Sequence, residues 1–183
     1  MTLLNGFFPS ATEQPNVLAI SGDMTDAAFD EMAKNDRLAP VIEGLRKGLT
    51  LADLLDLTPA HIEALMTQAV HLVQAGQFAP ARDLLLRAMQ LSPLEARSSF
   101  VMGMTYQLEG DLPRAAHFYM QFIALDATNP DGYLRLGECL LAAGERDNAR
   151  DALNAARAFA LDGKGRAGAL AQAERLLASL GDA

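Results

Sequence analysis

The sequence predicts an all-α protein in which three tandem helical hairpins form most of the chain. Glycines recur at a period of 34 residues, at positions 76, 110 and 144, where each would end the first helix of a hairpin. Three further columns share this period: small residues (Ala69, Gly103, Gly137), alanines (Ala81, Ala115, Ala149) and large residues (Leu85, Tyr119, Leu153). Because small residues on facing helices let two backbones approach closely, the columns predict tightly packed helix pairs.

A capping signal precedes each predicted hairpin. A polar residue followed by proline is typical of a helix start, because the side chain caps the helix and proline suits its first turn. The three signals are Thr58-Pro59, Ser92-Pro93 and Asn129-Pro130. This spacing and these small and bulky columns are the tetratricopeptide repeat pattern.

Two residues depart from the repeat. Phe122 stands where the other repeats have Ala88 and Ala156, and Arg146 stands where they have Phe78 and Leu112. We expect the turn of the third hairpin to be looser for this reason.

The hairpins occupy residues 58–163, and different segments flank them. Residues 164–183 have apolar residues at helical spacing, which predicts a capping helix over the last apolar face. Residues 25–57 predict short N-terminal helices, one of them capped by Thr50. Residues 1–24 mix Gly, Pro, Asn and Ser with isolated apolar pairs, which predicts a flexible segment.

Composition narrows the function. The 183 residues carry a formal charge of −8, which argues against binding to nucleic acid or to anionic lipid, since both need clustered Lys and Arg. The single cysteine, Cys139, favours a reducing compartment. The sequence has no basic leader followed by an apolar run and no apolar stretch of membrane-spanning length. We therefore expect a cytoplasmic protein.

The sequence offers no catalytic constellation. His61 and His71 are ten residues apart on one predicted helix, about 15 Å along its axis, so they cannot share a metal ion. Cys139 lies inside the third repeat without a histidine in the pattern to activate it. We expect no enzyme activity, no catalytic residue, no metal and no cofactor.

A binding surface follows from the repeat. Stacked hairpins form a right-handed superhelix whose concave groove is lined by the first helix of each pair. The repeat register places the following residues in that groove: Glu63, Met66, Val70, Val73, Arg97, Phe100, Met104, Gln107, Asp131, Leu134, Glu138 and Leu141. An exposed apolar groove favours protein binding, although Met and Leu at helical spacing are also typical of a core.

Residues 48 to about 160 resemble the class II chaperones of type III secretion translocators, the LcrH/SycD-like tetratricopeptide repeat family. Four runs carry the resemblance: residues 48–54 (Gly-Leu-Thr-Leu-Ala-Asp-Leu), 62–65 (Ile-Glu-Ala-Leu), 76–78 (Gly-Gln-Phe) and 137–141 (Gly-Glu-Cys-Leu-Leu).

The resemblance implies a bacterial cytosolic chaperone that binds hydrophobic translocators without ATP. It implies that a Pro-x-Leu-x-x-Pro segment lies in the groove, at positions that match Met66, Val70, Val73, Phe78, Phe100, Met104 and Gln107 here. It also implies a homodimer through residues 25–57. The family's groove is richer in aromatic residues, so a wider pocket is expected in this chain.

A generic repeat adaptor for a bacterial envelope or pilus-type assembly is the alternative. Such a groove usually holds a basic clamp for a carboxylate, for which only Arg97 and Arg135 are candidates.

Overall fold

The computed structural model describes residues 26–181, and every regular element in that range is a helix. The described residues fall into two units, with the boundary at Ile62 and Glu63. None of the described helices is both long enough and apolar enough to span a membrane.

The first unit contains helical residues 26–33, α2 (Ala39–Arg46) and α3 (Leu51–Leu54). Thr50 caps α3 as expected: its hydroxyl oxygen accepts from the Asp53 amide at 3.2 Å, while its own amide donates to the Asp53 carboxylate at 2.7 Å. The hydrogen bonds from Thr50 lower the pKa of Asp53. A Cβ atom on Gly44 would lie 2.5 Å from Leu54 Cδ2, so α2 and α3 approach closely at this glycine.

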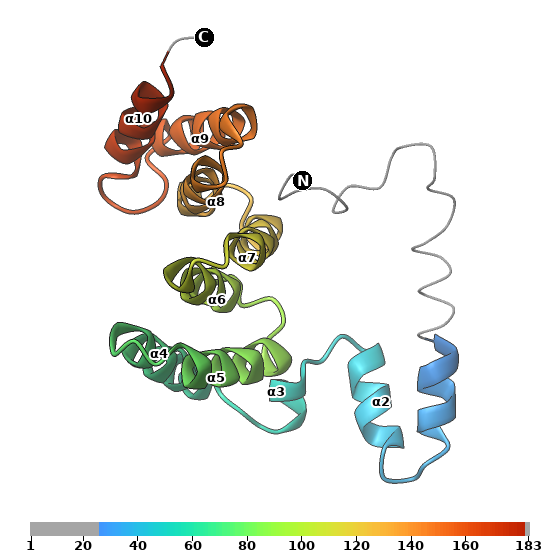
Figure 1. Ribbon diagram of the computed structural model, residues 1–183. Coiled ribbons are helices and arrows are strands. Elements are labelled where there is room, and N and C mark those ends of the chain that lie inside the picture. Colours follow the sequence, from blue (N-terminus) through green and yellow to red (C-terminus); the bar gives the residue numbers. More distant parts are fainter. Residues whose placement is uncertain (1–25, 182–183) are drawn as a thin grey trace. The chain divides into compact units, whose positions relative to one another are not determined.

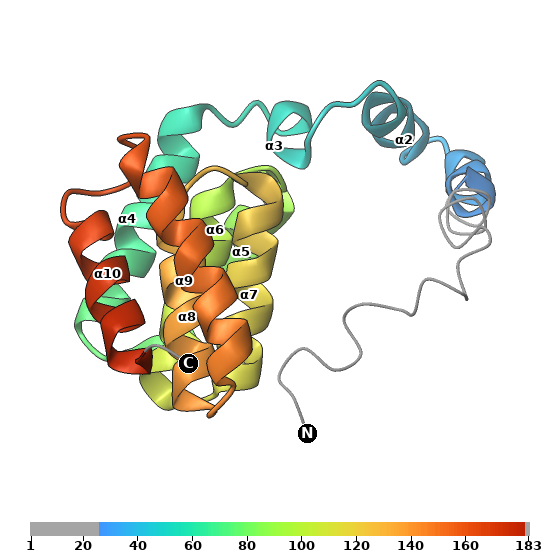
Figure 2. The same cartoon turned by 90° about the horizontal axis from the view of Figure 1, so that it is seen from above.

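The second unit is a stack of helices joined by short turns (Figures 1 and 2). Successive helices from α5 (green) to α10 (red) follow one another along the stack (Figure 1). Their bounds are α4 (Pro59–Gln74, which crosses the unit boundary), α5 (Phe78–Leu91), α6 (Ala96–Glu109), α7 (Leu112–Leu125), α8 (Pro130–Ala142), α9 (Arg146–Leu161) and α10 (Ala169–Leu180). The all-α fold and its three hairpins are those that the sequence predicts.

The columns of the repeat have the predicted packing roles. The turn glycines 76, 110 and 144 have φ angles of 71°, 81° and 82°, a left-handed conformation that favours glycine. A Cβ atom on Gly103 would lie 2.7 Å from the Tyr119 ring, and one on Gly137 would lie 2.8 Å from Leu153. The paired helices α6–α7 and α8–α9 therefore touch through these two glycines.

Two of the three predicted helix starts are found. Pro59 begins α4, and Asn129 caps α8 by accepting from the Asp131 amide at 3.1 Å. The prediction for α6 is wrong, since that helix begins at Ala96 and not at Pro93. Its cap is Glu95, whose carboxylate accepts from the Arg97 amide at 3.1 Å. Residues 92–95 therefore lie in the connection between α5 and α6.

Phe122 is accommodated by a glycine on the next hairpin. Its ring is buried where the other repeats have alanine, and a Cβ atom on Gly132 would lie 2.6 Å from it. The first turn of α8 can approach α7 only because residue 132 has no side chain.

Arg146 has a specific contact that the repeat does not require. Its guanidinium donates to the Leu180 carbonyl at 2.6 Å, and Arg150 donates to the Gly181 carbonyl at 3.2 Å. The last carbonyls of a helix have no partner within that helix, so these arginines cap the end of α10. Arg146 therefore ties the third turn to the terminal helix, which is a different role from the looser turn that we expected.

Candidate functional site

A hollow of about 360 Å³ lies between α4 and α6, on the first helices of two successive hairpins. Met66, Val70 and Phe100, which the repeat register places in the groove, all line it. The full lining is Glu63, Met66, Thr67, Val70, His71, Gln74, Arg97, Phe100 and Val101. The sequence-based prediction thus brings together three apolar residues that share one cavity.

The floor of this hollow is firmly packed. Met66 is only 4% exposed, and the Ser98 hydroxyl contacts its sulfur at 3.2 Å. The Phe100 ring packs against the rings of Tyr119 and Phe122, with centroids 5.7 and 5.0 Å away. Val70 and Phe100 are half-buried, so each still presents apolar surface to a partner.

Arg97 lies at the edge of the hollow and is already paired. Its guanidinium donates to both carboxylate oxygens of Glu95 at 2.9 Å and to Glu63 at 2.8 Å. The bond to Glu95, followed by that to Glu63, raises the pKa of Arg97, and the bond from Arg97 lowers the pKa of Glu95. Arg135 is paired too, with Glu138 at 3.0 Å. Both candidates for a carboxylate clamp are therefore engaged, which weakens the adaptor alternative.

Gln107 and Glu138 belong to a hydrogen-bond network that joins α6, α7, α8 and α10. The Tyr119 hydroxyl donates to Gln107 at 2.6 Å, and the Gln107 amide donates to Glu138 at 3.1 Å. The Gln172 amide donates to the other oxygen of Glu138 at 2.5 Å. Burial raises the pKa of Tyr119, which keeps its hydroxyl protonated as a donor. The network fixes the positions of the helices that carry the predicted groove.

Other predicted groove residues lie elsewhere. Leu134 is 0% exposed and belongs to a core cluster with residues of α9 and α10, so it presents no surface to a partner. Val73 is buried, and Leu141 packs against the cluster that contains Leu134. Phe78 and Met104 are half-buried and line neither this hollow nor the second one, described next.

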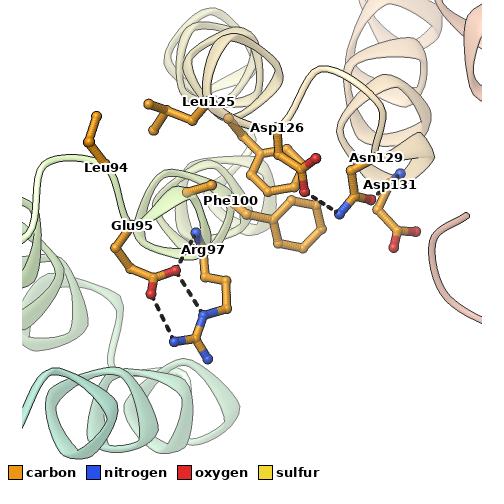
Figure 3. A pocket seen from close by; sticks show the side chains of 10 residues that line it. Leu94, Glu95, Arg97, Phe100, Leu125, Asp126, Asn129 and Asp131 are labelled. Carbon is orange, nitrogen blue, oxygen red and sulfur yellow. Dashed lines mark hydrogen bonds and ion pairs between the residues drawn. The ribbon is translucent and has the colours of Figure 1, made fainter. Parts of the chain in front are cut away.

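A second hollow, of about 480 Å³, opens at the start of α6 (Figure 3). It shares Arg97 and Phe100 with the first, so the two are neighbours. The residues that line it come from the start of α6, the end of α7 and the start of α8: Leu94, Glu95, Ala96, Arg97, Phe100, Phe122, Leu125, Asp126, Asn129 and Asp131. Sequence reasoning missed this hollow because it combines the ends of three helices with a loop residue.

His61 and Cys139 have structural roles. His61 Nδ1 accepts from the Thr58 amide at 3.0 Å at the start of α4. Cys139 is fully buried, and burial, followed by the charge of Glu138, raises the pKa of its thiol to about 12. Over residues 26–181, His, Cys, Asp and Glu form no group of three or more that could hold a metal ion.

Comparison with known proteins supports the repeat assignment. A family model described as tetratricopeptide repeat matches residues 107–165, from the end of α6 through α9. Comparison with curated proteins finds no match.

Several solved structures are similar to this chain, and two of them come from type III secretion systems. A type III secretion complex from Aeromonas hydrophila is 28% identical over 77% of this chain and 95% of that chain, with a TM-score of 0.69. The Yersinia enterocolitica translocator chaperone SycD is 23% identical over 72% and 96%, with a TM-score of 0.64. PcrH bound to the chaperone-binding region of PopD is 24% identical over 68% and 93%, with a TM-score of 0.63.

The chain therefore has the fold of the translocator chaperones, and the resemblance predicted from its sequence is confirmed. SycD is described as a translocator chaperone, and PcrH as bound to a chaperone-binding region.

Proposed function

We propose that this chain is a cytoplasmic chaperone of type III secretion translocators. It binds an extended apolar segment of a hydrophobic translocator and keeps that protein soluble and competent for export. The observation that carries the proposal is the hollow between α4 and α6, whose apolar lining Met66, Val70 and Phe100 follows from the repeat register. The likeness to chaperones with translocator segments bound supports the same reading.

The shape and chemistry of the hollow suit an extended peptide. Its volume lies within the range of roughly 300–1,000 Å³ that is common for ligand pockets. The thioether of Met66 can adapt to side chains of different shapes, while the packed ring of Phe100 gives a fixed wall. A segment of the Pro-x-Leu-x-x-Pro kind fits this use, because its prolines preform an extended conformation and lower the entropy lost on binding.

Binding of this kind needs no ATP. A chaperone that binds an exposed apolar segment lowers the free concentration of the aggregation-prone chain by mass action. The affinity then sets how much translocator stays soluble, and release requires only that another component compete for the segment.

We propose that residues 25–57 mediate a homodimer. In the first unit, several large apolar side chains are exposed, and such a concentration on a small unit favours a protein contact. They are Met32, Leu38, Leu49, Leu51 and Leu55. Leu55→Glu is expected to convert a dimer to a monomer in light scattering, and an unchanged mass would contradict this proposal.

Co-expression tests the chaperone proposal. The chain is produced with the translocator proteins encoded beside its gene, as the wild type, as Val70→Glu, and as Leu86→Glu, a control at an exposed leucine of α5. A carboxylate at position 70 places an unpaired charge against apolar surface, which is expected to weaken binding by about tenfold or more.

We expect the wild type and Leu86→Glu to keep a translocator soluble and to co-purify with it, and Val70→Glu to lose most of the complex. The proposal fails if the translocators stay insoluble with the wild type and no complex co-purifies. It also fails if Val70→Glu and Leu86→Glu behave alike.

A further inference from the structure

The second hollow, at the junction of α6, α7 and α8, has apolar walls and remains open. Leu94 lies in the loop before α6 and is 79% exposed, and Leu125 at the end of α7 is half-buried. The Phe100 ring also lines the hollow and lies below Asp126, on the side of Arg97 (Figure 3). An exposed leucine beside a half-buried leucine and a phenylalanine gives a surface that a partner side chain can cover.

The repeat alone does not require this hollow. The positions that correspond to Phe122 hold Ala88 and Ala156, and those that correspond to Asp126 hold Ser92 and Ala160. The aromatic wall and the carboxylate thus occur together only at the junction of the second and third hairpins.

The charge of the hollow favours a cationic occupant. Of its three carboxylates, Glu95 is paired with Arg97, and Asp131 is paired with Arg166 at 2.8 Å. Asp126 accepts a hydrogen bond from the Asn129 amide at 2.9 Å, and among residues 26–181 it has no cationic partner. An apolar wall beside an uncompensated carboxylate suits a side chain with an aliphatic stem and a cationic head.

We propose that this hollow receives a lysine or arginine side chain of the bound partner segment. The inference rests on the proposed function. The stem of that side chain lies on Leu94, Leu125 and the Phe100 ring, and its cation pairs with Asp126. Because the two hollows share Phe100 and Arg97, a peptide that fills the first hollow continues directly into the second. The chaperone therefore selects segments with a basic residue beside the apolar one.

A peptide series tests this selection. Short fluorescein-labelled peptides carry Pro-Ala-Leu-Ala-Ala-Pro between alanine flanks, with one lysine or one norleucine at successive flanking positions. Norleucine has the stem of lysine without the charge. Affinities are measured by fluorescence anisotropy for the wild type and for two variants. Asp126→Asn keeps the size of the side chain and its hydrogen bond to Asn129. Asp151→Asn is a control at an exposed carboxylate of α9.

At one flanking position, lysine is expected to bind the wild type about three- to fivefold more tightly than norleucine, as for a partly exposed ion pair. That preference disappears in Asp126→Asn, persists in Asp151→Asn and weakens with added salt. If peptides bind but no position favours lysine, or if Asp126→Asn keeps the preference, this inference is overturned and the proposed function stands. If no peptide binds the wild type, the proposed function fails and this inference fails with it.

Discussion

Phe122 stands where the other repeats have alanine, and Gly132 makes room for its ring. The energetic coupling of these two residues can be measured. Phe122 is 4% exposed, and a Cβ atom on Gly132 would lie 2.6 Å from its Cδ1 atom and 2.8 Å from Ile123 Cγ1. The aromatic residue and the glycine should therefore be energetically coupled.

The size of this coupling can be worked out. Phe122→Ala removes a buried ring and is expected to cost about 3–5 kcal/mol. Gly132→Ala overpacks the contact at a cost of about 1–3 kcal/mol, partly offset by about 0.5–1 kcal/mol from the better helix propensity of alanine. With Phe122 already replaced, the added Cβ atom meets only Ile123, so the remaining clash and the better helix propensity of alanine should nearly cancel. The expected coupling energy is about 1–2 kcal/mol.

Urea unfolding followed by far-UV circular dichroism measures all four members of the cycle, since the chain has no tryptophan. Gly137→Ala is the matched control: its Cβ atom would meet Leu153 in the third hairpin, so its effect should add to that of Phe122→Ala. If Gly132→Ala changes stability equally in both backgrounds, within about 0.5 kcal/mol, the proposed compensation is refuted.

Two further predictions concern Arg146 and Cys139. Arg146→Ala should weaken hydrogen-exchange protection in α10 by about 1 kcal/mol, because the Leu180 carbonyl loses its donor, whereas Arg157→Ala, at an exposed arginine of α9, should leave it unchanged. Native Cys139 should resist iodoacetamide until the protein unfolds. Because burial raises its pKa from 9.0 to about 12, the unfolded thiol loses its proton first, so stability should fall as pH rises between these values and fall less in Cys139→Ala. Rapid alkylation of the native thiol, or equal alkaline loss in both proteins, would contradict this.

The fold was predictable from sequence because its signals are local and repeat. Gly103 and Gly137 are small because a large side chain faces each one, and the two positions are one repeat apart. The helix start at Ala96 was missed because Glu95 caps it through its own carboxylate, while Ser92 and Pro93 also form a plausible start signal.

The candidate site was only partly predictable. The repeat register correctly placed Met66, Val70 and Phe100 together, because each lies on the same face of its helix. It failed for Leu134, because residues of α9 and α10 pack around that side chain, and the register of a single hairpin carries no information about this.

The 34-residue period also carries information about polar contacts between repeats. Glu63 and Arg97 are 34 residues apart, as are Glu138 and Gln172, so a pair of polar residues one repeat apart can bond across neighbouring hairpins. The 34-residue period therefore predicts Glu63 as a partner of Arg97. The second hollow gave no such signal, because Leu94 and Asp126 come together only through the packing of three helices.

Site-specific photo-cross-linking can show whether the partner segment lies in the hollow between α4 and α6. A benzoylphenylalanine replaces Gln74, an exposed residue that lines the hollow, or Leu86, an exposed residue of α5. In cells that produce the translocators, the probe at position 74 should cross-link to a translocator and the probe at position 86 should not. Cross-linking from position 86 alone, or from neither position while a complex co-purifies, would contradict the account.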